Sequence, residues 1–313
     1  MNKFQKALDE YLSIRRSLGF GLRILDSSMR NFISFLEREG AAHITTELAV
    51  RWAKTPNNVK PATWSWRLGM VRRFASWYRA VDPNTEVPPE GLFPYRHRRK
   101  PPYIYTDDEI EGIIKAAGEL PSSKGLRGPT YSTIFGLLAV TGMRVNEALL
   151  LDRQDVDLKK GILRIRRTKF GKSRLLPVHS SATNALKRYA VTRDRIFSVF
   201  TTRAFFVSER CTRITEWIAR YTFAKVSQRI GLRPYAKGHG RGPRLHDMRH
   251  RFAARTLIRW YRMGLDVERE IHKLSTYLGH VHVNDTYWYI EAVPELLQLA
   301  TERLMEDRKG DTP

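Results

Sequence analysis

The beginning of the chain carries apolar side chains at the three- and four-residue spacing of amphipathic helices. Between Phe4 and Tyr78 these positions fall into separate groups, and each group is long enough for a helix of a few turns. We therefore predict four or five short helices in this part of the chain. The groups are Leu8, Tyr11 and Leu12; Met29, Phe32, Ile33 and Phe35; Leu48, Val50 and Trp52; and Met70, Phe74, Trp77 and Tyr78.

The periodicity stops between Val81 and Tyr105, where proline is frequent and a basic run, Arg96 to Lys100, occurs. Proline stiffens an extended chain and charge keeps it solvated, so this composition is typical of a linker. A helix start follows, because Thr106 to Glu109 has the capping-box pattern ahead of apolar residues. The chain therefore divides into three predicted segments. These are a helical domain at 1–95, a basic proline-rich linker at 96–105 and a second domain at 106–313.

Within the second domain the apolar spacing is helical, except for one segment with the two-residue period of strands. Ile162–Arg166 and Arg174–Val178 flank a turn that contains glycine, which predicts a β-hairpin, and Val156–Leu158 is a candidate third strand. The predicted fold class is therefore mainly α (α+β), with helices around a small antiparallel sheet. The helical segments are 131–140, 145–151, 182–191, 215–230, 245–263, 267–277 and 294–305.

The composition indicates the kind of partner. The sequence has 55 Lys and Arg against 32 Asp and Glu, a net charge of +23. Such a charge repels itself unless the protein works on a polyanion, so nucleic acid is the expected partner. No apolar stretch approaches the ~20 residues of a membrane span, and no membrane partner is expected. A single cysteine, Cys211, excludes an internal disulfide and fits a reducing compartment, which predicts a cytoplasmic, nucleoid-associated protein.

Six side chains of the second domain form a set that can transfer a phosphodiester without a metal. Such a reaction needs cations that neutralise the nonbridging oxygens as charge builds, a nucleophile, and a proton donor for the departing oxygen. Glu147 and Lys172 lie near members of the set in sequence and are candidates for supporting roles. The six are Arg144, Lys169, His246, Arg249, His280 and Tyr289.

The order of these residues resembles the tyrosine recombinase family, the phage integrases and their relatives, over about the C-terminal two thirds of the chain. The resemblance rests on five motifs in the family's order. They are Thr141-Gly-Met-Arg-Val-Asn-Glu147, the hairpin lysine Lys169, Leu245-His-Asp-Met-Arg249, Leu278-Gly-His280 and the downstream Tyr289. Each motif alone is weak, but their joint order and spacing are specific.

The resemblance implies a role for each matched residue. Arg144 and Arg249 hold the phosphate, and His280 donates a hydrogen bond to it. His246 is a general acid/base beside the nucleophile, and Lys169 protonates the leaving 5′ oxygen. Tyr289 forms a 3′-phosphotyrosyl intermediate, so neither ATP, a metal nor another cofactor is expected.

Alternatives remain open at several positions. Lys172 competes with Lys169 for the acid role, and Tyr287 competes with Tyr289, because aromatic residues precede Tyr289 and leave the helix register uncertain. His246 and His250 have a spacing that can bind zinc on a helix, but position 247 is Asp where the metalloprotease signature has Glu. We therefore assign His250, like His282, to packing or the surface.

The resemblance also implies an architecture and an assembly. Residues 1–95 match the helical core-binding (SAM-like) domain, which closes a C-shaped clamp around DNA with the catalytic domain. The protein then acts as a dimer on a recombination site and a tetramer in synapsis, with the helix after Val293 docking on a neighbour or packing on its own domain. Its source is expected to be a mobile genetic element. The rival functions are a type IB topoisomerase and a non-catalytic architectural DNA-binding protein.

Overall fold

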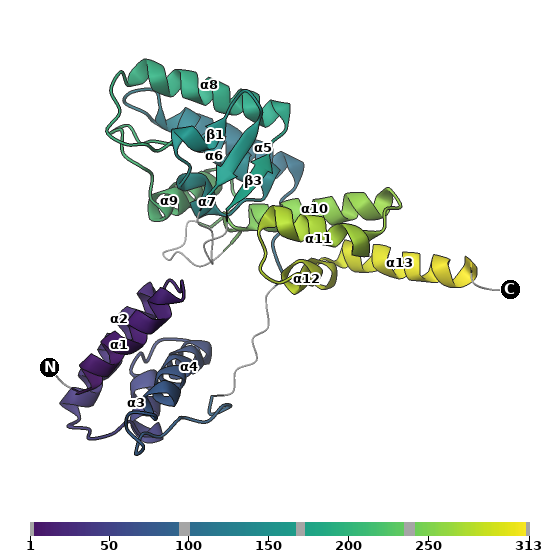
Figure 1. The fold of residues 1–313 in the computed structure, drawn as a ribbon. Coiled ribbons are helices and arrows are strands. Elements are labelled where there is room, and N and C mark those ends of the chain that lie inside the picture. The colour runs from purple at the N-terminus through teal and green to yellow at the C-terminus, as the bar shows by residue number, and fades with distance from the viewer. Residues whose placement is uncertain (1–2, 94–100, 167–172, 235–241, 311–313) are drawn as a thin grey trace. The chain divides into compact units, whose positions relative to one another are not determined.

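The computed structural model describes residues 3–93, 101–166, 173–234 and 242–310 (Figure 1). The chain forms two compact units, Met1–Lys100 and Pro101–Pro313. Most described residues are helical and one small antiparallel sheet is present, so the predicted fold class is confirmed. The basic run of the linker, Arg96 to Lys100, lies outside the described residues, as do the hairpin lysines Lys169 and Lys172.

The first unit is a small helical domain with its own core. Its four helices are α1 (Lys3–Ser17), α2 (Arg23–Arg38), α3 (Thr46–Lys54) and α4 (Pro61–Tyr78), which confirms the helices expected from the apolar spacing. The Thr45 hydroxyl caps α3 by accepting a hydrogen bond from the Leu48 N–H at 3.2 Å. Buried Phe32 and Trp52 meet at the centre of this core, with their ring centroids 5.0 Å apart.

The second unit opens with helices that cover the sheet. They are α5 (Asp107–Gly118), α6 (Arg127–Thr141), α7 (Val145–Leu149), α8 (Ser180–Ile196) and α9 (Glu216–Arg229). The predicted capping box is present. The Thr106 hydroxyl accepts from the Glu109 N–H at 3.1 Å, and the Glu109 carboxylate accepts from the Thr106 N–H at 2.8 Å.

The sheet has the order β1 (Val156–Asp157), β2 (Ile162–Ile165) and β3 (Arg174–Pro177), and both pairs are antiparallel. This confirms the predicted hairpin and its third strand. Leu163 pairs with Leu176, and both side chains are buried in the main core of the unit. The alternation of side chains along β3 places Arg174 on the same face as Leu176.

Four helices complete the unit and form a second core cluster (Figure 1). They are α10 (Asp247–Arg262), α11 (Val267–Leu278), α12 (Asn284–Ala292) and α13 (Pro294–Gly310). The sequence analysis did not predict α12 as a separate helix. At the start of α13, Leu296 is fully buried in this cluster, whereas Leu297 and Met305 are exposed. The first turns of α13 thus pack on their own unit.

The two core clusters meet along α10. Met248, at the start of this helix, belongs to the main core, and Ala253, just over one turn later, belongs to the second cluster. The motif residues of α10 therefore lie where the sheet-containing part of the unit joins the last helices.

Candidate active site

Arg144 is positioned by a left-handed glycine at the end of α6. Gly142 has φ 61°, and a Cβ atom at this position would lie 2.5 Å from Cδ1 of Phe252, so only glycine fits without a shift. The chain then turns, and Arg144 is the residue that precedes α7. The Gly142 carbonyl accepts a hydrogen bond from Nη1 of Arg249 at 2.9 Å. The glycine of the first arginine motif therefore also holds the second arginine.

A second left-handed glycine acts in the same way at the end of α11. Gly279 has φ 68°, and a Cβ there would lie 2.7 Å from Nη1 of Arg174. The Gly279 carbonyl accepts from Nη2 of Arg144 at 2.9 Å, and the Leu278 carbonyl accepts from Nη2 of Arg249 at 2.8 Å. Carbonyls at the C-terminal end of a helix lack intrahelical partners and carry partial negative charge. They hold both guanidiniums in place without cancelling their charge.

Glu147 joins Arg144 to Arg174. Its carboxylate accepts from the backbone N–H of Arg144 at 2.9 Å and from Nη1 of Arg144 at 3.0 Å. Arg174 donates to both carboxylate oxygens, at 3.0 and 2.8 Å, and its Nε donates to the Tyr277 carbonyl at 2.9 Å. Burial alone would raise the pKa of Glu147, but these two arginines hold that pKa below its usual value. The carboxylate is therefore ionised and fixes both side chains.

Arg249 lies deeper than Arg144, with only 3% of its surface exposed. Burial, and then repulsion from Arg144, lowers the pKa of Arg249 to about 10. The guanidinium is still protonated at neutral pH. Two nearby cations with a common orientation make a site for a phosphate, whose charge would compensate both.

Tyr289 lies on α12 with 2% of its surface exposed. Burial raises the pKa of the phenol, and Arg249 and Arg144 act in the opposite direction. Its hydroxyl oxygen lies 3.0 Å from Nδ1 of His250, and its ring lies nearly parallel to that of His280 at a centroid distance of 6.4 Å. The phenol is therefore neutral at neutral pH and must lose its proton in order to act as a nucleophile.

The two motif histidines are neutral at pH 7. Burial is the main reason that the pKa of His246 falls to about 4, with further lowering by His250 and Arg249. Burial and then Arg249 lower the pKa of His280 to about 3. Nδ1 of His280 lies 2.6 Å from the Thr286 hydroxyl. When that hydroxyl donates, the imidazole proton is on Nε2, which can then donate to a phosphate.

The structure brings most of the sequence-predicted residues together. Arg144 and Arg249 donate to the neighbouring carbonyls of Gly279 and Leu278. The ring of His280, the next residue, lies 6.4 Å from that of Tyr289 between centroids. The ring of His246 packs edge-on against that of His250, with a centroid distance of 4.9 Å. Lys169 and Lys172 lie outside the described residues.

Two residues at this site were missed. His250 does pack against the rings of Trp288 and Tyr289, but its ring nitrogen also contacts the phenol of Tyr289, which the assignment to packing or the surface did not include. The sequence signal for His250 is its position four residues after His246, which places both side chains on the same helix face. We interpreted this spacing only as a possible zinc-binding pair. Arg174 was also missed. The sequence signal for Arg174 is its position two residues before Leu176, which places both side chains on the core face of the strand. A charged side chain on that face needs a buried partner.

Tyr287, the competing candidate, and Tyr277, a third tyrosine near the last motif, have other surroundings. The ring of Tyr277 stacks on Phe252 with a centroid distance of 5.5 Å and an interplanar angle of 20°. Tyr287 is half-buried in the second core cluster. Burial also raises the pKa of Tyr277. Neither arrangement resembles the approach of Tyr289 to the two arginines.

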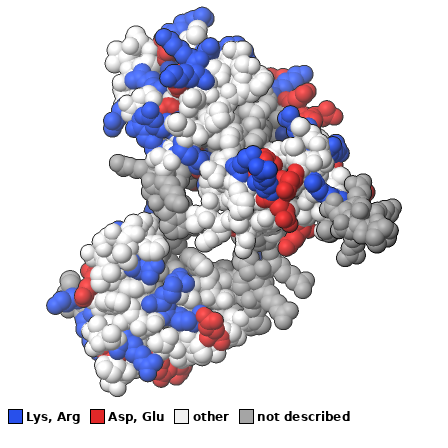
Figure 2. Space-filling model, turned by 45° about the vertical axis from the view of Figure 1, so that its right-hand side comes forward, with Lys and Arg blue, Asp and Glu red and all other residues white. Residues whose placement is uncertain are grey.

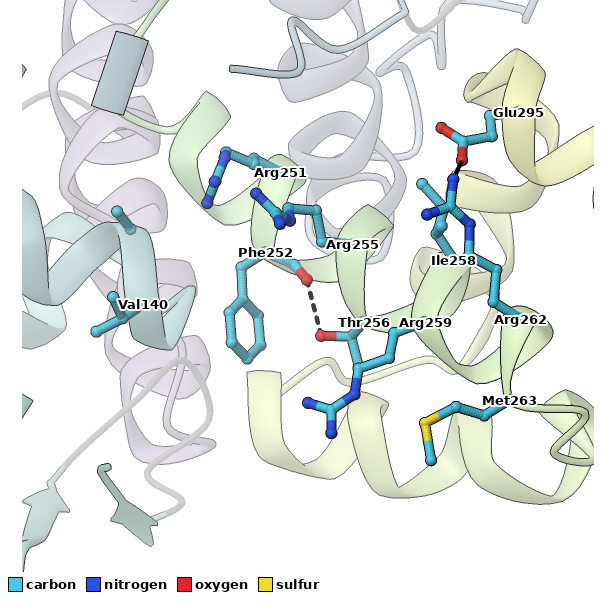
Figure 3. A pocket seen from close by; sticks show the side chains of 11 residues that line it. Val140, Arg251, Phe252, Arg255, Thr256, Ile258, Arg259, Arg262, Met263 and Glu295 are labelled. Carbon is cyan, nitrogen blue, oxygen red and sulfur yellow. Dashed lines mark hydrogen bonds and ion pairs between the residues drawn. The ribbon is translucent and has the colours of Figure 1, made fainter. Parts of the chain in front are cut away.

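A pocket on the far side of α10 is separate from this site. Figure 3 shows its lining of arginine, Phe252 and Met263 side chains beside Val140. Arg251 and Arg255 both pair with Asp107, and Arg262 pairs with Glu295 at 2.6 Å. These arginines are roughly half a helical turn away from Arg249 around α10. Their charge is partly neutralised, so this pocket is not a second phosphate site of the same kind.

The residues that the structure describes contain neither a metal-binding group nor a membrane-spanning helix. Among the described residues, no group of three or more His, Cys, Asp and Glu side chains is arranged to hold a metal ion. No helix in the described ranges is both long and apolar enough to cross a membrane.

Comparisons with known proteins agree on one family. The model of the phage integrase family matches residues 104–295. A protein of Sinorhizobium fredii, "Putative integrase/recombinase y4rB", is 45% identical over 315 residues, which cover 98% of this chain and 100% of that protein. Tyrosine recombinase XerC of Pelotomaculum thermopropionicum is 27% identical over 256 residues, 78% of this chain and 77% of the relative. A solved lambda integrase tetramer bound to a Holliday junction has a similar fold, with a TM-score of 0.60, 18% identity, and coverage of 91% of this chain and 76% of that one.

Proposed function

The chain belongs to the phage integrase family of tyrosine recombinases, and from this premise we propose a site-specific DNA recombinase in which Tyr289 is the nucleophile. One observation carries the assignment of the residues. Arg144 and Arg249 donate to carbonyls at the ends of α6 and α11, and both arginines are close enough to His280 and Tyr289 to lower the pKa of each. This arrangement has two fixed cations, one hydrogen-bond donor and one nucleophile for a single phosphate.

The arginines and His280 act on the charge that develops during strand cleavage. As the Tyr289 oxygen attacks phosphorus, negative charge grows on the two nonbridging oxygens. Arg144 and Arg249 are already held by hydrogen bonds to helix-end carbonyls, so they stabilise this charge with little reorganisation. Each preorganised donor of this type is worth roughly 100- to 1000-fold in rate. Glu147 and Arg174 keep Arg144 in place.

The other half of the reaction concerns the departing oxygen. When the bond from phosphorus to the 5′ oxygen breaks, this oxygen takes a proton from Lys169, the family's general acid, with Lys172 as the alternative. The product is a 3′-phosphotyrosyl bond and a free 5′ hydroxyl. That hydroxyl attacks the phosphotyrosine of a partner strand, so the bond energy is retained and ATP is not used. Because arginine and lysine side chains supply the positive charge, the proposed chemistry needs no metal.

Basic surface explains the choice of substrate. Figure 2 shows Lys and Arg side chains in patches on each of the two units, consistent with the net charge of +23. We assign DNA binding to a core-binding, SAM-like domain at 1–95, a linker at 96–105 and the catalytic domain at 106–313. The relatives reported above are recombinases or integrases, and nothing favours a topoisomerase or an architectural protein.

The assembly follows that of the related lambda integrase, which is a tetramer on a Holliday junction. We infer a dimer on one recombination site and a tetramer in synapsis. The exposed Leu297 and Met305 leave the outer part of α13 available to dock on a neighbour, even though Leu296 is buried in its own unit. The protein is expected to act in the cytoplasm, on nucleoid DNA or a mobile element.

A covalent-trapping experiment tests this proposal. DNA that is covalently attached to the protein in host cells is recovered and sequenced, and a nicked suicide substrate is made from the site. Tyr289→Phe removes one oxygen atom, so the adduct on a denaturing gel should disappear while DNA affinity stays unchanged. Tyr287→Phe is the matched control and should cleave normally. An adduct formed by Tyr289→Phe would move the nucleophile to another residue.

A further inference from the structure

We propose that His250 is the general base that takes the phenolic proton of Tyr289, with Asp247 behind it as a positioning residue. The inference rests on Tyr289 being the nucleophile. It differs from the role implied by family resemblance, which gives the acid/base function to His246. The contacts among these three side chains support the role of His250.

The distance between His250 and the nucleophile fits proton transfer. Nδ1 of His250 lies 3.0 Å from the hydroxyl oxygen of Tyr289, within the range required of a general base. The side chain of His250 is 12% exposed, and its ring contacts those of Tyr289 and Trp288 at centroid distances of 5.6 and 5.5 Å. Because both groups are buried, bulk water does not compete for the proton.

A carboxylate stands on the other side of the imidazole. Oδ1 of Asp247 lies 3.9 Å from Nε2 of His250, and Asp247 is only 2% exposed. This distance is too long for a hydrogen bond but short enough for strong attraction in a buried site. Arg244 fixes the carboxylate, donating to it from its backbone N–H at 2.7 Å and from Nη2 at 2.9 Å. A nucleophile, a base and a third group that stabilises the base are the parts of an activated nucleophile.

His246 is placed differently. Its ring touches that of His250 edge-on at 4.9 Å, one helical turn earlier on α10. A proton that leaves the Tyr289 hydroxyl therefore meets His250 first. Repulsion from His250 contributes to the lowered pKa of His246, so a proton on His250 disfavours a second one on its neighbour. This leaves His246 neutral and able to contact the phosphate.

In the proposed step, each bond that breaks is matched by a bond that forms. The O–H bond of Tyr289 breaks, and its proton moves to Nδ1 of neutral His250, whose other proton is on Nε2 facing Asp247. The tyrosine oxygen forms its bond to phosphorus as the bond from phosphorus to the 5′ oxygen breaks. A different acid protonates that 5′ oxygen. In the rejoining step the proton on His250 returns to Tyr289.

The test uses full-length protein and the suicide substrate. His250→Ala should slow adduct formation at least ~100-fold, the lower end of the range for general acid/base catalysis. His250→Gln keeps a hydrogen-bonding side chain of similar size but cannot take the proton, so it should be equally slow. His282→Ala, an exposed histidine on the same unit, is the matched control and should react at the wild-type rate.

Two further readouts separate a base from a merely structural residue. Replacing Tyr289 by 3,5-difluorotyrosine makes the phenol more acidic, so it should restore much of the rate lost in His250→Ala. A substrate with a 5′-bridging sulfur, which leaves without a proton, should not. A wild-type rate for His250→Gln, rescue by the sulfur substrate, or a defect that difluorotyrosine does not reduce would each overturn the base role.

Different results decide whether Tyr289 is the nucleophile and whether His250 is its base. If wild-type protein forms no adduct, or if Tyr289→Phe forms one, Tyr289 is not the nucleophile, whatever His250 does. If Tyr289 carries the adduct and difluorotyrosine rescues His246→Gln but not His250→Ala, His246 is the base. Unfolding midpoints and DNA affinities of all variants show whether a slow variant is folded and bound.

Discussion

Two buried arginines in the second unit, Arg193 on α8 and Arg249 on α10, are equally hidden but differently surrounded. Each has 3% of its surface exposed. Arg193 pairs with Asp194 at 2.7 Å, donates to the Phe205 carbonyl at 2.7 Å, and lies against aromatic rings, including that of Phe205 at 5.0 Å. Arg249 donates to two helix-end carbonyls, and no carboxylate in the described ranges lies within ion-pair distance of it.

The difference distinguishes a structural cation from one kept for a ligand. Burying a charge is costly unless the charge is compensated. At Arg193 the neighbouring carboxylate and the aromatic faces supply the compensation permanently. At Arg249 another cation, Arg144, is close enough to lower its pKa, so the site is stabilised when an anion enters. Burial alone does not make an arginine a candidate for binding an anionic substrate, whereas burial without a neutralising partner does.

The largest expected effect is a loss of cleavage rate on removal of Arg249, the arginine of this pair that we propose acts on the phosphate. Arg249→Ala should slow DNA cleavage by roughly 100- to 1000-fold, the loss expected for one preorganised donor to the transition state. Single-turnover kinetics on the suicide substrate measure it. Arg255→Ala, on the same helix but facing the pocket of Figure 3, is the matched control. Similar losses for both variants would mean that the whole helix, and not the buried cation, is required.

The second effect should appear in stability and not in catalysis. Arg193→Ala leaves the Phe205 carbonyl without its donor and removes contacts with aromatic rings. We expect the free energy of unfolding to fall by about 2 kcal/mol, within the range for an unsatisfied buried group. The cleavage rate per folded molecule should not change. Urea denaturation measures the loss, with exposed Arg195→Ala as the control. A cleavage defect in folded Arg193→Ala protein would remove the distinction between the two arginines.

Most residues of the proposed active site could be selected from the sequence because they sit in short motifs with a fixed order. Gly142 and Gly279 are part of those motifs, and their left-handed backbone turns the chain where the arginines need carbonyls. Arg174, which pairs with Glu147, lies outside the motifs. These residues are far apart in sequence, and the strand alternation shows only that Arg174 faces inward, not which carboxylate meets it.

The helix register around Tyr289 could not be predicted from the spacing of apolar residues, and the reason is different. Tyr287, Trp288 and Tyr289 are three consecutive aromatic residues, so the apolar side chains do not mark a single face and the 3.6-residue period cannot select one of them. Contacts with His250 and the second core cluster decide which ring is buried. For the same reason the role of His250 could not be predicted, since its partner is determined by the register of α12.

A smaller effect concerns the ionised carboxylate beside the catalytic arginines. Glu147→Gln keeps the shape of the side chain but removes the charge that fixes Arg144 and Arg174. We expect about a 10-fold loss in cleavage rate, because the donors remain but are less well oriented, and transition-state stabilisation depends on that orientation. Arg174→Ala should have a similar effect, and the double variant should be little worse than either single one. Independent losses that multiply would show that the two residues do not act as one unit.

The smallest effect is a pH dependence of stability that comes from the neutral histidine of the same site. The pKa of His246 is lowered from 6.5 to about 4, so between these values the unfolded chain binds a proton that the folded protein does not. Stability from this group is therefore present above pH 6.5 and is lost as the pH falls toward 4. We expect His246 to account for about 1 kcal/mol of the loss between about pH 7 and 5.5. His246→Gln, compared with wild type by urea denaturation at both pH values, should lose stability less steeply on acidification. Because Arg249 and His250 cause part of the pKa shift, Arg249→Ala should flatten the same dependence in part. A wild-type slope in His246→Gln would place the titrating group elsewhere and would show that the positive field around Arg249 does not extend to this histidine.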